Sequence, residues 1–356
     1  MLIVRYLPGQ LMHWTIAAPF IDKLKSKNEA WLVPFIPGTR HQFDIIPRRE
    51  PLKSWHERKS AVTGFKDWLI YWQHGTEAIK ATKGGVITVF PQLPAVVGMQ
   101  QRMTSKRIPV VACLFNVGTC SVGMRRRFAQ FSLKEIDCFV VHTRREREIY
   151  NQWLGIPIER FEFVPYQSPE IPITYEENTT DPFITALGSA HRDFPTLFQA
   201  VSKLNIPTVV ASGSRAINGL SIPPNVKTPL DITKAECRRL AQEARINIVP
   251  LLPNPIVTAA GQITIVEAMR MGRAVIASRC FGAEDYIEHG KTGLLVEPES
   301  VDDLTQAIEM LWNDSALRDH LGVAAKTYAA ENFSDEVVAS ELRRILDQVA
   351  DKAGMY

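Results

Sequence analysis

The residues best suited to chemistry lie in the stretch 246–298, where a loop of small residues leads into a predicted helix that carries a carboxylate. The loop ends with Ala259–Gly261, and the helix is predicted to begin near Gln262–Thr264. Free N–H groups and the positive end of the helix dipole at such a turn suit a diphosphate. Glu267 lies about one turn into the helix, where it could accept hydrogen bonds from two ribose hydroxyls. An ordinary packing turn fits the same residues, so both interpretations stand at this point.

Three segments of this stretch occur in a characteristic order. They are Gly-Gln-Ile-Thr-Ile-Val-Glu-Ala-Met, Met-Gly-Arg-Ala-Val-Ile-Ala-Ser and His-Gly-Lys-Thr-Gly-Leu-Leu-Val-Glu-Pro. Together they resemble the donor-site signature of the GT-B glycosyltransferases, specifically glycosyltransferase family four. The resemblance implies that Glu267 binds the ribose of a nucleotide and that the preceding loop holds its phosphates. The positions that it places near the diphosphate are Gly261, Gln262, Ile263 and Thr264.

One position departs from this signature. The family usually has a second glutamate eight residues before the ribose-binding one, near the donor sugar, and this chain has Ala259 there. The resemblance therefore predicts the nucleotide half of the site better than the sugar half.

A second match opens the C-terminal half, where Phe183–Val201 has the pattern of a strand, a glycine turn and a helix. The family commonly has an arginine after this strand and a lysine at the start of the helix, and both bind the donor phosphates. By position, Ser189 stands in place of the arginine and Arg192 in place of the lysine. We predict that Arg192 is the main catalytic cation and neutralises the leaving diphosphate. The alternative is a surface arginine that caps a turn beside Asp193.

Two further segments are candidates for contact with the base or ribose. Ser212 and Arg215 follow a predicted strand, and Thr228 and Leu230 lie where the family's base-contacting backbone would fall. Contacts from backbone groups do not identify the base, so specificity for uracil stays open.

The N-terminal half offers fewer matches. Gly9 and Gln10 resemble the family's glycine-containing loop over the donor phosphates, although a plain turn fits them almost equally well. Asn116 lies roughly where many members place a histidine beside the reacting sugar. Its amide can hydrogen-bond a sugar hydroxyl but cannot act as a base. We take Asn116 as the second candidate catalytic residue.

The elements that must position these residues alternate between short apolar runs and helical patterns. Strands are expected at 2–6, 31–35, 42–46, 86–90, 109–114, 138–143, 161–164, 182–187, 207–211, 246–250, 274–277 and 293–296. Helices are expected at 14–25, 65–82, 94–103, 125–132, 144–154, 301–313, 315–331 and 334–353, with others between the later strands. Apolar, β-branched runs separated by helices indicate buried parallel sheets.

The alternation is interrupted at residues 166–181, which are rich in Pro, Ser, Glu, Asn and Thr and resemble a linker. The fold class that follows is α/β, in the GT-B arrangement of two doubly wound Rossmann-like domains facing a central cleft. The expected parts are an acceptor-binding domain at 1–168, a linker at 169–181, a nucleotide-sugar-binding domain at 182–333 and a C-terminal helix at 334–356. That helix is expected to pack back on the N-terminal domain.

Composition narrows the function classes. A chain of 356 residues with 46% apolar and 22% charged residues is typical of a folded protein with two domains. A net charge of +3 does not indicate a nucleic-acid partner. The 5 cysteines are scattered without zinc spacing, which favours reduced thiols in a cytoplasmic enzyme. No apolar run is long enough to span a membrane. The basic cluster Lys106, Arg107 and Arg125–Arg127 fits either peripheral contact with an anionic membrane or a solvated helical face.

These observations predict a retaining transferase without a cofactor or metal, since the chain has no Asp-x-Asp motif to hold one. Retention is implied by the family resemblance alone, and front-face transfer is the expected route. The donor would be a nucleotide diphosphate hexose such as UDP-glucose, and the acceptor a saccharide or lipid-linked saccharide in exopolysaccharide or cell-envelope glycan synthesis. A sugar-nucleotide epimerase or hydrolase and a catalytically inactive nucleotide-sugar binding protein are the alternatives. A nicotinamide dehydrogenase fits less well, because no Gly-x-Gly-x-x-Gly follows a predicted strand.

Overall fold

A computed structural model describes residues 11–21, 31–38, 40–47, 63–104, 107–230 and 232–354. The chain divides into two compact units. Unit 1 is Met1–Val164 together with Val338–Tyr356, and unit 2 is Pro165–Val337. The last helix of the chain therefore belongs mostly to unit 1.

Unit 1 is built on a parallel sheet of six strands in the order β2-β1-β3-β4-β5-β6. The strands are β1 Met12–Ala17, β2 His41–Ile46, β3 Gly85–Val89, β4 Val110–Cys113, β5 Cys138–Val141 and β6 Phe161–Phe163. The helices are α1 Phe65–Ala81, α2 Gln92–Thr104, α3 Gly123–Leu133, α4 Arg144–Leu154 and α11 Asp335–Ala353, and short 3-10 turns lie at Val33–Phe35 and Ile158–Arg160.

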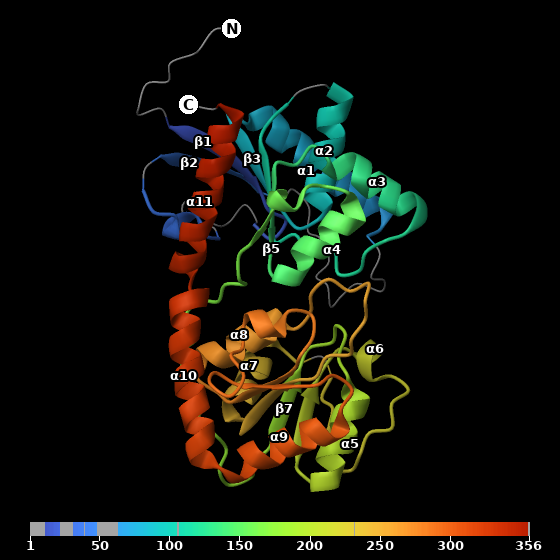
Figure 1. Ribbon diagram of the computed structural model, residues 1–356, viewed down its shortest axis with the longest axis vertical. Helices are drawn as coiled ribbons and strands as arrows, with labels where there is room; N and C mark the ends of the chain where they lie inside the picture. The colour runs from blue at the N-terminus through green and yellow to red at the C-terminus, as the bar shows by residue number, and fades with distance from the viewer. Residues whose placement is uncertain are drawn as a thin grey trace. The chain divides into compact units, whose positions relative to one another are not determined.

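Successive residues of each strand point to opposite sides of this sheet, and helices cover both sides. Ile87 and Val111 pack against the apolar side chains of α11, including Leu342 and Ile345. Their chain neighbours, such as Val110, instead join the core formed with α1, α2 and α4. Figure 1 shows α11 on one side of the strands and the other helices of the unit on the opposite side.

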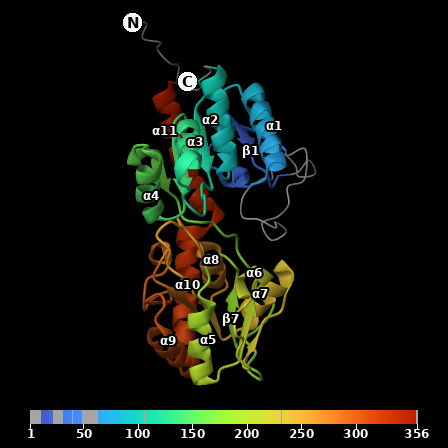
Figure 2. The same cartoon turned by 90° about the vertical axis from the view of Figure 1, so that its right-hand side faces the viewer.

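Unit 2 repeats the plan, with a parallel sheet in the order β12-β11-β10-β7-β8-β9. The strands are β7 Ile184–Leu187, β8 Thr208–Ala211, β9 Val226–Lys227, β10 Ile246–Val249, β11 Val275–Ser278 and β12 Leu294–Val296. The helices are α5 Phe194–Leu204, α6 Ser214–Ile217, α7 Lys234–Glu243, α8 Gln262–Arg270, α9 Val301–Asn313 and α10 Ser315–Phe333, with a 3-10 turn at Ala283–Asp285. One core joins α5 and α9 to the sheet and another joins α8 and α10 (Figure 2).

Most predicted elements are confirmed within a few residues, and two predictions in the N-terminal half are wrong. Residues 12–17 form strand β1 rather than the start of a helix, and Trp14 is fully buried in it. The expected strand at 31–35 contains a 3-10 turn, since Pro34 has no N–H to give to a strand ladder. The strand expected at 2–6 lies outside the described residues. The short edge strand β9 was not predicted.

The segment after residue 165 is fastened to unit 2 by side chains of that unit. The buried Gln242 accepts hydrogen bonds from the N–H groups of Thr174 and Tyr175 at 2.9 Å each and donates to the carbonyl of Pro172 at 2.9 Å. Glu177 forms ion pairs with Arg245 at 2.8 Å and with Arg318 at 3.5 Å. The linker-like composition is thus compatible with a well-anchored path, because one glutamine satisfies three of its backbone groups.

Within the described ranges, no helix has the length and apolarity needed to cross a bilayer.

Candidate functional site

Three loops of unit 2 meet at one edge of its sheet. Strands β10, β7 and β8 are adjacent at its centre and run parallel, so the loops that follow them leave from the same edge. These loops are residues 188–193, 212–213 and 250–261. Ligands of open parallel sheets bind at this carboxyl edge, which makes it the candidate site.

Hydrogen bonds join the three loops directly. The Oγ of Ser189 accepts from the N–H of Gly213 at 2.6 Å, and the Ser212 hydroxyl donates to it at 3.1 Å. On the other side, the N–H of Leu252 donates to the carbonyl of His191 at 3.0 Å. The predicted residues Ser189 and Ser212 are therefore neighbours, in a network that limits how far the loops can move.

Helix α8 begins at this edge without a side-chain cap. Gly261 is its N-cap residue and adopts a left-handed backbone with φ of 94°, so no capping side chain accepts a hydrogen bond from the first-turn N–H groups. Gln262 is buried and its amide donates to the carbonyl of Phe281 at 2.6 Å, whereas the Ile263 side chain is exposed. The first-turn N–H groups and the helix dipole thus offer a site for an anion.

Arg192 reaches the same turn from the loop after β7. Its guanidinium donates to the carbonyl of Leu187 at 3.0 and 3.1 Å and to that of Ala190 at 2.9 Å. It also donates to Oγ1 of Thr264, on the first turn of α8, at 3.2 Å. All of these acceptors are neutral, and no carboxylate of the described residues forms an ion pair with Arg192. Desolvation lowers its pKa to about 10, so the side chain is a positive charge without a counter-charge at neutral pH.

The alternative role for Arg192, a surface arginine that caps a turn beside Asp193, also fits these contacts, because its guanidinium donates to the carbonyls of Leu187 and Ala190 in that turn. Asp193 is buried and caps α5 itself, since its Oδ1 accepts from the N–H of Thr196 at 3.2 Å. The bond from Arg192 to Thr264 extends beyond this turn and reaches α8.

Glu267 lies in the second turn of α8, and its partly exposed carboxylate has a partner that the sequence did not reveal. Nζ of Lys234, on the first turn of α7, lies 3.6 Å from its Oε1. Burial and the nearby charge of Glu267 raise the pKa of Tyr166. Lys234 is 33 positions before Glu267 in the chain, so no local spacing could have indicated the pair.

The remaining predicted residues of unit 2 lie further along the same edge. Arg215 is on the short helix α6 after β8. Thr228 and Leu230 follow the edge strand β9, which is separated from β7 by β8. Ala259, where the family usually has a glutamate, is buried. Their roles stay predictions.

In unit 1, Asn116 lies on the loop after β4. Its Oδ1 accepts from the N–H of Gly118 at 2.7 Å, which shapes the loop. The N–H of Val117 donates to the Tyr150 hydroxyl at 3.2 Å, and that hydroxyl donates to the buried Glu146 at 3.0 Å. The loop is thus held from beneath by α4. The other N-terminal candidates, Gly9 and Gln10, lie outside the described residues, as does Lys106.

Comparison with known proteins identifies this architecture. Residues 189–314 match the family model described as "Glycosyl transferases group 1". The structure of a sucrose-phosphate synthase from Thermosynechococcus elongatus superposes with a TM-score of 0.69 and 16% identity, over 96% of this chain and 100% of that one. Anabaena Alr3699/HepE in complex with UDP gives a TM-score of 0.65 and 12% identity, over 95% and 100%. The chain has the GT-B glycosyltransferase fold.

Curated relatives match over shorter segments. N,N'-diacetylbacillosaminyl-diphospho-undecaprenol alpha-1,3-N-acetylgalactosaminyltransferase of Campylobacter jejuni is 28% identical over 112 residues, which is 30% of each chain. The human alpha-1,3/1,6-mannosyltransferase ALG2 is 33% identical over 87 residues, 24% of this chain and 21% of that one. The matches therefore span less than a third of the relatives' length. The family model covers residues 189–314 of this chain.

The close packing at Gly261 gives a first prediction. An alanine Cβ there would lie 3.1 Å from Val249 Cγ1 and 3.2 Å from Leu251 Cδ1, at a φ that alanine rarely adopts. We expect Gly261→Ala to lower the free energy of unfolding of unit 2 by about 2 kcal/mol or more, through backbone strain and crowding together. Urea unfolding measures the change.

The matched control is Gly219→Ala, because Gly219 also has a positive φ, of 79°, but an added Cβ would meet nothing within 4 Å. It should cost only the strain, about 1 kcal/mol. Equal losses from the two substitutions would contradict the crowding at α8.

Glu146 gives a second prediction, about pH. Burial raises the pKa of Glu146 to about 7, against an ordinary value of 4.5. The folded state therefore binds the proton more tightly than the unfolded chain, and the free energy of unfolding should fall as pH rises from about 4.5 to about 7, by about 3 kcal/mol from this group.

Glu146→Gln should remove that part of the pH dependence, since an amide can donate to Tyr150 and accept from the N–H groups of His142 and Thr143 without ionising. Glu148→Gln, which removes an exposed carboxyl of the same helix, is the control. Urea unfolding across this pH range checks the slope, and identical slopes for the wild type and Glu146→Gln would contradict the prediction.

Proposed function

We propose that this protein transfers a sugar from a nucleotide diphosphate donor, bound by unit 2, to a saccharide or lipid-linked saccharide acceptor. The observation that carries the proposal is the uncompensated guanidinium of Arg192 beside the uncapped first turn of α8. A desolvated cation and free helix amides at one point are complementary to a diphosphate. The group 1 glycosyltransferase domain over 189–314 supports the same function.

The donor we propose is a UDP-hexose such as UDP-glucose. Support comes from the similar fold of Anabaena Alr3699/HepE, whose structures were determined in complex with UDP and with UDP-glucose. In this chain, Glu267 would accept hydrogen bonds from the ribose hydroxyls, one turn beyond the phosphates, and Ser212, Arg215, Thr228 and Leu230 would lie towards the base.

In the proposed reaction the acceptor hydroxyl attacks the anomeric carbon as the bond from that carbon to the diphosphate oxygen breaks. The departing phosphate oxygen takes the proton of the attacking hydroxyl, and transfer on the same face retains the configuration. Arg192, Thr264 and the amides of Gly261–Ile263 stabilise the negative charge that develops on the leaving group. Asn116 would orient the sugar, and no metal ion or cofactor is needed in this scheme.

The names of two relatives support the proposed acceptor class. The matched Campylobacter jejuni enzyme is named for a diphospho-undecaprenol acceptor, and a capsular polysaccharide biosynthesis glycosyltransferase, CapM of Staphylococcus aureus, is 32% identical over 82 residues. We therefore propose a place in exopolysaccharide or cell-envelope glycan synthesis.

A nucleotide-sugar binding protein without transferase activity is the second candidate, because the buried Ala259 replaces a carboxylate that the family usually has near the donor sugar. Calorimetric titration in EDTA with UDP, GDP and ADP, followed by a multiple-turnover assay with the matching sugar conjugates, separates the two. Selective metal-free binding with turnover supports a transferase. Binding without transfer or donor hydrolysis favours the binding protein, and the absence of nucleotide binding at millimolar concentration would overturn both.

Arg192 allows a direct test of phosphate binding. We expect Arg192→Gln to weaken UDP binding by about 2 kcal/mol, about 30-fold, since a charge-assisted hydrogen bond is lost. Arg192→Lys should retain part of the affinity, because it keeps the charge without the planar fork. The control, Lys203→Gln, removes an exposed cation of unit 2 that pairs with Asp302. Wild-type affinity in Arg192→Gln would remove Arg192 from the site.

Glu267 requires a test that separates ribose binding from stability. Glu267→Ala should weaken UDP binding by about 2 kcal/mol, and the loss should disappear when the ligand is 2′,3′-dideoxyuridine diphosphate, which lacks both hydroxyls. Lys234→Gln is the control, because it breaks the ion pair but keeps the carboxylate. An equal loss for both ligands in calorimetry would show that Glu267 does not contact the ribose.

A further inference from the structure

Helix α3 of unit 1 exposes an unusual number of apolar side chains. Val122, just before the helix, is 80% exposed, and Met124, Phe128 and Phe131 are 76%, 46% and 48% exposed. The last three lie at spacings of four and three residues, so they form one ridge along the helix. We call this ridge with its flanking residues the outer face of α3. Only Ser132 and Leu133, at the C-terminal end of α3, are buried.

The arginines of α3 are arranged around this ridge. At about 100° per residue, Arg125 and Arg127 lie on either side of it, whereas Arg126 points to the opposite side of the helix. Arg126 donates to the carbonyls of Trp153 and Gln152, at the end of α4, at 2.8 and 2.9 Å. Arg125 and Arg127 are exposed and make no hydrogen bond or ion pair with the described residues. The outer face therefore combines an apolar ridge with two open cations.

The position of these charges is unfavourable for the helix itself. All three arginines lie in the first turns of α3, near the positive end of its dipole, and the helix has no acidic residue. The N-cap residue Val122 provides no side-chain hydrogen bond. A negatively charged partner would offset this repulsion, whereas water alone does so only in part.

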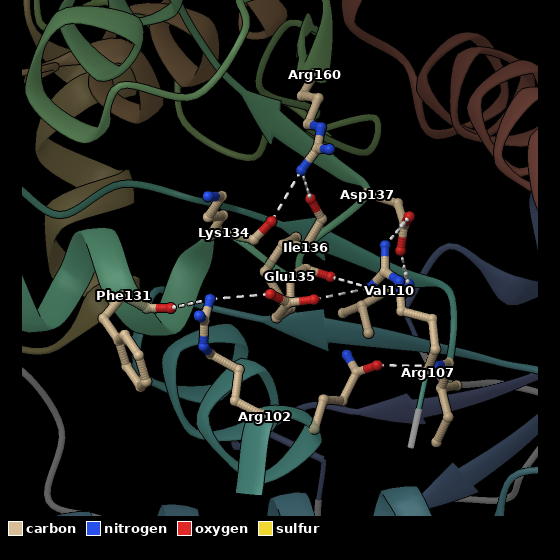
Figure 3. A network of polar contacts seen from close by, with 11 residues as sticks. Arg102, Arg107, Val110, Phe131, Lys134, Glu135, Ile136, Asp137 and Arg160 are labelled. Carbon is tan, nitrogen blue, oxygen red and sulfur yellow. Dashed lines mark hydrogen bonds and ion pairs between the residues drawn. The ribbon is translucent and has the colours of Figure 1, made fainter. Parts of the chain in front are cut away.

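The base of the ridge is held rigidly. The guanidinium of Arg102, from α2, lies 4.0 Å from the centre of the Phe131 ring and forms an ion pair with Glu135 at 3.0 Å. Figure 3 shows the ion pair between Arg102 and Glu135 as part of a network in which Arg107 binds Asp137 at 2.6 Å and Arg160 binds the carbonyl of Lys134 at 2.9 Å. The C-terminal end of the ridge is thus connected to α2 through Phe131.

We propose that the outer face of α3 docks this protein on an anionic lipid bilayer. Met124 and Phe128 would enter the boundary between headgroups and acyl chains, and Arg125 and Arg127 would contact lipid phosphates on either side. A bilayer fits better than a protein partner, because exposed apolar side chains with a cation on each side and no acidic residue in the helix match an anionic surface with an apolar interior. The proposal does not depend on the proposed transfer reaction.

Vesicle flotation with the full chain tests the docking. Vesicles of phosphatidylcholine and phosphatidylglycerol in equal parts should bind the protein, vesicles of phosphatidylcholine alone should bind it much less, and added salt should weaken the binding. Arg125→Gln with Arg127→Gln should reduce binding about 30-fold, since each basic residue contributes about 1 kcal/mol near such a surface. Met124→Ser with Phe128→Ser should reduce it about tenfold.

Matched controls make the result specific to this face. Lys80→Gln with Lys83→Gln removes the same charge from exposed positions in or just after α1, and Met310→Ser with Val323→Ser removes exposed apolar side chains from α9 and α10. Both controls should bind vesicles as the wild type does, and the circular dichroism spectra of all variants should match that of the wild type. Equal losses in the controls, or no preference for anionic vesicles, would overturn the proposal. So would a self-association that the α3 variants abolish without any vesicle binding.

Discussion

The guanidinium of Arg192 is the interaction on which the loops of the candidate site depend. It binds the carbonyl at the end of β7 and the threonine at the start of α8, so it joins two of the three loops that form the edge of unit 2. The approach is so close that a Cβ on Gly188 would lie 2.5 Å from its Nη2 atom. Gly188 has a φ of 99°, which by itself favours glycine, and it also leaves room for the guanidinium. Since every acceptor around it is neutral, the arginine organises the loops and still keeps its charge for a ligand.

The sheet beneath the loops holds them in this arrangement. Strands buried on both faces fix the direction in which each loop leaves, and a parallel sheet brings all of the loops to one edge. Buried polar side chains then connect the loops to the layers around them, as Gln262 does with the carbonyl of Phe281 and Ser278 with the N–H of Leu251. A rigid frame of this kind lets a small, uncapped turn at Gly261 face an anion with little rearrangement.

Periodicity predicted the elements that have a single consistent pattern. The helices Arg144–Leu154 and Val301–Asn313 were predicted to the residue, because their caps and apolar spacing agree. Trp14 was placed in a helix because an aromatic and β-branched run is compatible with either element until its neighbours are known, and only the register with β2 and β3 decides it. The meeting of Ser189 with Gly213 and of Lys234 with Glu267 depends on strand order, which no local spacing encodes. The residue roles in donor binding, and those of Gly9 and Gln10, stay predictions.

The arginines of this chain show why net charge predicts so little about its partners. Arg126 gives its donors to carbonyls at the end of α4, where a cation is favoured by the helix dipole, and so it acts as a structural cap. Arg192 also binds carbonyls, but at a desolvated position beside a helix start, so its field remains directed at the site. Arg125 and Arg127 have neither kind of partner among the described residues. The net charge of +3 counts all of these arginines in the same way. Only the groups around each arginine distinguish a cation that holds the fold from one that is available to a ligand or a surface.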